Sequence, residues 1–83
     1  MMTAERLAGG AAIAAFTRAL PRVLLHALDV QRAAGDIALA IELGHDPAEL
    51  AELVAYGVVG LVNADQTMRH RLRRYAVTPP VRS

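Results

Sequence analysis

The residues of this sequence that could take part in chemistry are three histidines, eight carboxylates and nine arginines, with no lysine and no cysteine. Glu42 and His45 have the Glu-x-x-His spacing of di-iron carboxylate bundles. Such a site needs a second pair of this kind, and Gly44 interrupts the helix that would hold His45. We therefore expect no metal, no cofactor, no catalytic residue and no enzymatic activity. His45 is predicted to be a surface residue that pairs with Asp46 or Glu49.

The charges are distributed unevenly along the chain. Residues 29–65 contain seven acids and one arginine, whereas residues 66–83 contain five arginines and no acid. Two interpretations of this asymmetry stay open. The two segments could pair with each other within or between chains, or the basic segment could contact nucleic acid.

Four arginines lie in residues 68–75, where Met68, Leu72 and Tyr75 or Ala76 predict the apolar stripe of a helix. Positive charge near a helix C-terminus complements the helix dipole, and arginine stems cover apolar surface. Docking onto an acidic protein surface and contact with nucleic acid are the two functional interpretations. The residues that would make either contact are Arg69, Arg71, Arg73 and Arg74.

Residues 36–54 have the spacing of a helix-turn-helix. Ala40 stands where that motif has a small residue, and Gly44 stands four residues later, where the turn adopts a left-handed backbone. These 19 of the 83 residues resemble a helix-turn-helix. The resemblance implies that four leucines pack between the two helices, namely Leu39, Leu43, Leu50 and Leu53.

The second helix of this motif carries charges that oppose DNA binding. Its exposed side is predicted to present Asp46, Glu49 and Glu52, which would repel a phosphate backbone. The motif also usually has an aliphatic residue after the turn glycine, where this chain has His45. We therefore interpret the motif as a structural corner whose three acidic residues face a protein partner.

Two or three helices are expected in the first half of the chain. Thr3 can cap a helix that Pro21 stops. Pro21 also suits the first turn of a following helix. Residues 22–43 form either one helix or two, and we favour two, with a break at Gly35 and with Asp36 as the second cap.

The second half of the chain contains the clearest sequence signal for the start of a helix. Asp46 predicts a helix cap and Pro47 the first helical residue. Residues 47–75 then form one helix or two, because the two glycines of "YGVVGLV" either end a helix or permit a close helix crossing. Residues 63–65 can cap a final helix that runs to about Tyr75.

The expected fold is all-α, a compact bundle of four or five short helices that contains a helix-turn-helix-like corner. Residues 1–77 are predicted to form a single helical domain and residues 78–83 a disordered tail. The apolar runs are shorter than the roughly 20 residues that span a bilayer, so no membrane association is expected. The absence of cysteine fits a cytoplasmic protein.

The predicted function is a non-enzymatic protein–protein interaction module that binds a partner or itself as a homo-oligomer. The predicted oligomer interface is Gly57, Val58, Val59, Gly60 and Leu61. The first alternative is a small helix-turn-helix-type DNA-binding regulator that holds phosphate with the basic C-terminal helix. The second alternative is a small inhibitor of a nucleic-acid-handling machine, whose acidic face occupies a site meant for nucleic acid.

Overall fold

The computed structural model describes the backbone of residues 2–81 and the side chains of residues 10–81. These residues form four α-helices and one short 3₁₀ helix, and no strand occurs among residues 2–81. The predicted all-α bundle is therefore confirmed. The elements are α1 (Met2–Ala19), η1 (Arg22–Leu24), α2 (Val30–Glu42), α3 (Pro47–Ala55) and α4 (Ala64–Val77).

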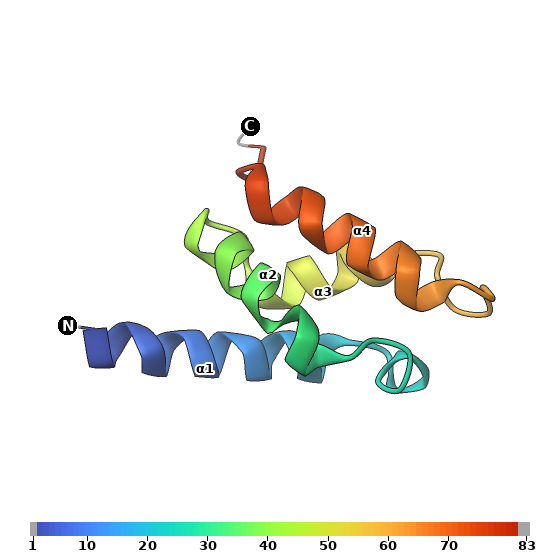
Figure 1. The fold of residues 1–83 in the computed structure, drawn as a ribbon, viewed down its shortest axis with the longest axis horizontal. Coiled ribbons are helices and arrows are strands. Elements are labelled where there is room, and N and C mark those ends of the chain that lie inside the picture. The colour runs from blue at the N-terminus through green and yellow to red at the C-terminus, as the bar shows by residue number, and fades with distance from the viewer. Residues whose placement is uncertain (1, 82–83) are drawn as a thin grey trace.

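The helices form a flat molecule whose Cα atoms extend over 41 × 29 × 17 Å. In Figure 1, α1 and α4 lie at opposite edges, with α2 and α3 between them. The packing follows this order, since α2 lies mainly against α4, and α3 mainly against α1. The two helices of the predicted corner are therefore each packed more closely on another helix than on one another.

The predicted start of α3 is confirmed. Asp46 is the cap, its Oδ2 accepts a hydrogen bond of 3.1 Å from the backbone N–H of Glu49, and Pro47 is the first helical residue. Gly44 has a φ of +113°, which a residue with a side chain rarely adopts. The turn between α2 and α3 therefore lies where the glycine and the capping residue predict it.

The predicted break at Gly35 and Asp36 is wrong. Helix α2 begins earlier, at a cap formed by Asp29, whose carboxylate accepts hydrogen bonds from the backbone N–H groups of Gln31 and Arg32. Gly35 lies inside this helix and is exposed. A mid-helix glycine costs about 1 kcal/mol relative to alanine, which burial of the apolar side of α2 outweighs. Residues 22–24 form only the short η1.

The question of one helix or two over residues 47–75 is resolved in favour of two. Helix α3 ends at Ala55, and α4 begins at Ala64. Gly57 and Gly60 have φ values of +68° and +92°, so neither continues a right-handed helix. The segment between the helices, residues 56–63, is referred to below as the α3–α4 loop.

The core runs through all four helices and η1. Its largest fully buried side chains are Phe16, Ile37, Leu50, Val54, Val58, Met68 and Leu72. The prediction that Leu39, Leu43 and Leu53 pack inward is wrong, because these side chains are 49%, 39% and 42% exposed. Since α2 and α3 pack mainly on other helices, the contact between α2 and α3 that would bury these three leucines is small.

Candidate functional site

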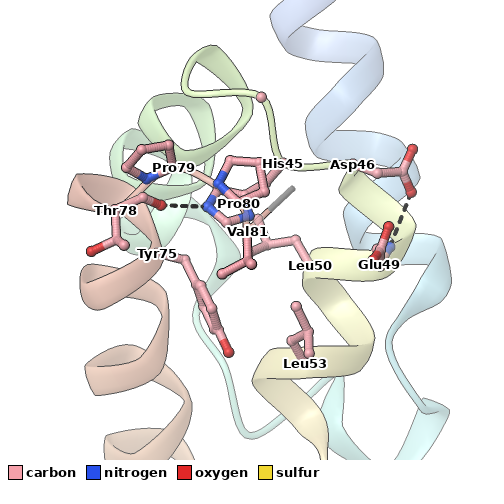
Figure 2. A pocket seen from close by; sticks show the side chains of 11 residues that line it. His45, Asp46, Glu49, Leu50, Leu53, Tyr75, Thr78, Pro79, Pro80 and Val81 are labelled. Atoms are coloured by element: carbon pink, nitrogen blue, oxygen red, sulfur yellow. Dashed lines mark hydrogen bonds between the residues drawn. The ribbon is translucent and has the colours of Figure 1, made fainter. Parts of the chain in front are cut away.

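His45 is buried, with only 7% of its surface exposed, which contradicts the predicted surface position. Its Nε2 lies 2.7 Å from the carbonyl oxygen of Thr78, and its ring meets the ring of Tyr75 edge-on at a centroid distance of 5.3 Å. Figure 2 shows this contact between the α2–α3 turn and the end of α4. The sequence did carry a signal for burial, because His45 stands where a helix-turn-helix usually has an aliphatic residue.

A pocket of about 400 Å³ lies beside His45 (Figure 2). Its lining comes from the α2–α3 turn, α3, the end of α4 and residues 78–81, and it includes Leu50, Leu53, Tyr75, Pro79 and Val81. The walls are thus largely apolar, and Asp46 and Glu49 stand at the α3 side. The carboxylate of Asp46 is already engaged in capping α3.

The structure describes residues 78–81 of the segment that was predicted to be a disordered tail. Residues 78–81 are not helical, and they lie against the α2–α3 turn. A β-carbon on Gly44 would lie 3.6 Å from Cγ of Pro80, so the turn and the tail are in close contact. Residues 82–83 lie outside the described residues, and the proposed domain boundary at residue 77 stays a prediction.

The three acidic residues predicted to face a partner are all exposed. Asp46, Glu49 and Glu52 lie at the start and along the outer side of α3. Among the side chains of residues 10–81, the ion pair between Asp65 and Arg69 is the sole one within contact distance. The acidic side of α3 is therefore not neutralised by the arginines of α4 within this described part of the chain.

The four arginines of α4 differ in their surroundings. Arg71 is half-buried, and its guanidinium donates hydrogen bonds to the carbonyl oxygens of Leu53, Val54 and Tyr56 at 3.4, 3.2 and 2.6 Å. These carbonyls belong to the end of α3, where helix geometry leaves acceptors without partners. Arg71 therefore binds α3, which argues against its predicted role in external contact.

Arg69, Arg73 and Arg74 remain exposed on α4. Arg69 lies 3.9 Å from Asp65, one turn earlier in the same helix. Arg69 and Arg73 point to the groove beside α2, where they line a hollow together with Arg32. Arg71 therefore has a structural role, whereas the other three arginines of α4 are accessible to a ligand or partner. Counting charges along the sequence did not distinguish them.

Replacing Arg71 with glutamine is expected to lower the free energy of unfolding by about 1 kcal/mol, the usual scale for hydrogen bonds that are partly exposed. Lysine at this position should restore part of this stability, because all three hydrogen bonds come from the single nitrogen Nη1 and an ammonium group also carries its N–H donors on one nitrogen. Urea unfolding measures both variants. Arg74→Gln is the matched control, and equal stabilities of the Arg71→Gln and Arg74→Gln proteins would contradict the assigned role.

The α3–α4 loop contains the residues predicted to form an oligomer interface, and one of them is corrected by the structure. Val58 is fully buried in the core and is not available for contact with another molecule. Gly57, Val59, Gly60 and Leu61 are exposed, as predicted for a contact surface. Tyr56 and Val62 flank these residues in the same loop and are more exposed than Val59 and Leu61, at 80% and 104%.

None of the described helices combines the length and the apolar character needed to cross a bilayer. Within the described residues, no group of three or more histidine or acidic side chains is arranged to hold a metal ion. Comparison with known proteins found no matching family model, no matching curated protein and no matching solved structure.

Proposed function

We propose that this chain is a non-enzymatic interaction module that binds a second copy of itself through the α3–α4 loop. The proposal depends above all on the exposure of large apolar side chains in a segment without charge. Clustered exposed apolar side chains are typical of contact surfaces between proteins, and the centres of such surfaces are enriched in aromatic residues and depleted in charges. The exposed side chains concerned are Tyr56, Val59, Leu61 and Val62.

The backbone of the loop is held in place before any partner binds. Buried Val58 anchors its middle, the backbone N–H of Val58 donates to the carbonyl of Ala55 at 3.1 Å, and that of Leu61 donates to the carbonyl of Val58 at 3.0 Å. Arg71 holds the carbonyl of Tyr56. A contact surface with a fixed backbone loses little conformational entropy on association, which favours binding.

A second apolar segment lies at the same end of the molecule. Figure 1 shows the connection between α1 and α2, which contains η1, at the same end of the longest axis as the α3–α4 loop. This connection exposes Val23 and Leu25. A chain of 83 residues buries a modest core by itself. Covering this apolar end with a second copy would add buried surface to a small domain.

The distribution of charge favours a second copy as the partner. The acidic residues 29–65 and the basic residues 66–83 belong to the same chain, yet the acidic side of α3 forms no ion pair with α4 among residues 10–81. Two copies can therefore place the acidic surface of one against the basic surface of the other. Complementary charges of this kind orient an interface and speed its formation.

Size-exclusion chromatography with light scattering tests the proposal. The native protein is expected to have the mass of two or more chains at high concentration and to dissociate on dilution. Val59→Asp should weaken association by about tenfold or more, because the new carboxylate would lose water in an apolar contact. Val77→Asp is the matched control, since Val77 is also exposed but lies near the end of α4.

Two results would contradict the proposal. One is a mass of a single chain for the native protein at every concentration. The other is an unchanged mass and an unchanged dissociation constant for Val59→Asp, which would place the contact elsewhere. Circular dichroism of each variant verifies that the helices are intact.

A further inference from the structure

A second hollow, of about 280 Å³, lies between α2 and α4, and we call it the basic hollow. Buried Ala33 forms part of its lining. Three arginines and one histidine surround it, against a single carboxylate. Its polar side chains are Arg32, Asp36, Gln66, Arg69, His70 and Arg73.

The folded chain gives Arg69 of the basic hollow a partner in Asp65 but does not explain Arg32 and Arg73. Arg32 lies in the first turn of α2, where the positive end of the helix dipole opposes a cation. Arg69 and Arg73 are four residues apart on α4, where two like charges repel each other. Among the side chains of residues 10–81, neither Arg32 nor Arg73 forms an ion pair. An anion between α2 and α4 would offset both the placement of Arg32 near the N-terminus of α2 and the repulsion between Arg69 and Arg73.

The geometry points to the basic hollow as a binding site for a phosphate group, carried by a small molecule or by a nucleic-acid backbone. Guanidinium groups match the oxygens of phosphate with paired hydrogen bonds, and they approach here from two helices. The amide of Gln66 offers a further donor. Arg69 is only loosely held by Asp65, at 3.9 Å, and can turn towards the ligand.

The lining of the basic hollow is separate from the apolar surface proposed for self-association, although Arg69 and Arg73 also belong to the basic segment that can face the acidic surface of a second copy. Its lining residues belong to α2 and α4, and none of them lies in the α3–α4 loop. Arg32 also comes from the acidic segment of the sequence, so the site is formed by one arginine of that segment and two from the basic segment. Failure of one proposal therefore leaves the other standing.

Nuclear magnetic resonance titration of the full chain with inorganic phosphate tests this site, with chloride at matched ionic strength as the reference. Saturable shifts are expected for the backbone amides of residues 32–36 and 66–73. The double variant R32Q/R73Q should weaken binding by about tenfold, since an exposed charge pair contributes up to about fivefold. The double variant R22Q/R74Q removes the same charge from outside the hollow and should bind as the native protein does.

A variant that is expected to tighten phosphate binding gives a second test of the site. Asp36→Asn removes the carboxylate from the hollow and should tighten phosphate binding by about threefold. Because this variant is expected to gain binding, unfolding cannot mimic its effect. Linear, unsaturable shifts with phosphate, or equal weakening in R32Q/R73Q and R22Q/R74Q, would overturn the proposal.

A parallel titration with a short single-stranded oligothymidylate distinguishes the two sources of phosphate. A nucleic-acid backbone is the source if the oligonucleotide binds more tightly than inorganic phosphate and weakens steeply between about 50 and 200 mM salt. A small molecule is the source if the oligonucleotide binds no more tightly than inorganic phosphate. In either case R32Q/R73Q should weaken the binding by about tenfold, and an unchanged affinity would overturn the assignment.

Discussion

Val58→Asp is expected to unfold the chain. Val58 is fully buried, and a carboxylate at this position would lie among apolar side chains without a partner. Substitutions of this kind destabilise by about 4 kcal/mol or more, whereas a domain of this size has a total stability of about 4–12 kcal/mol. Far-UV circular dichroism at room temperature should therefore show a loss of helix.

Val58→Ala gives a graded version of the same test. It removes two methyl groups from the core and should lower the free energy of unfolding by about 2 kcal/mol without abolishing the fold. Val59→Asp, one residue later in the α3–α4 loop, should keep the native helix content because Val59 is 56% exposed. A folded Val58→Asp protein that merely lost self-association would place Val58 in the interface, as the sequence first suggested.

His45→Ala is expected to lower the free energy of unfolding by about 2 kcal/mol. The change deletes the hydrogen bond between Nε2 and the carbonyl of Thr78 and removes the ring that meets Tyr75. It leaves both a carbonyl without its donor and a space between the α2–α3 turn and the end of α4. Urea unfolding gives the magnitude, and His26→Ala, at an exposed position, is the control.

Hydrogen exchange locates the same effect in the molecule. Residues 78–81 pack against the turn that carries His45, so their backbone amides should exchange faster in His45→Ala than in the native protein. Equal stability of His45→Ala and His26→Ala, together with unchanged exchange at these residues, would show that His45 does not hold this segment.

The apolar loop and the basic hollow lie on different elements and give the chain two distinct surfaces. The first would bind a second copy by excluding water from apolar side chains. The second would bind phosphate through arginine charge, with an affinity that falls as salt rises. Raising the salt concentration should therefore weaken phosphate binding more than self-association, in which the charges only supplement an apolar contact.

Features that depend on neighbouring residues could be predicted from the sequence. The start of α3 follows from the Asp46 carboxylate and the fixed φ of Pro47. The buried stripe of α4 follows from helical periodicity, since Met68, Leu72 and Ala76 share one side. Competition between two such local signals is harder to judge from the sequence, because Asp29 and Gly35 both mark possible helix boundaries and only the cap at Asp29 is used.

Features that depend on which elements meet could not be predicted in this way. Leu39 and Leu53 have suitable spacing for a helix-turn-helix contact, yet they are exposed because α2 and α3 pack mainly on α4 and α1. His45 and Arg71 are polar residues whose roles are set by carbonyl groups 33 and 15–18 residues away in the chain. A local pattern determines helix boundaries because capping and periodicity act within a few residues. Burial depends on the surface that folding brings opposite each side chain.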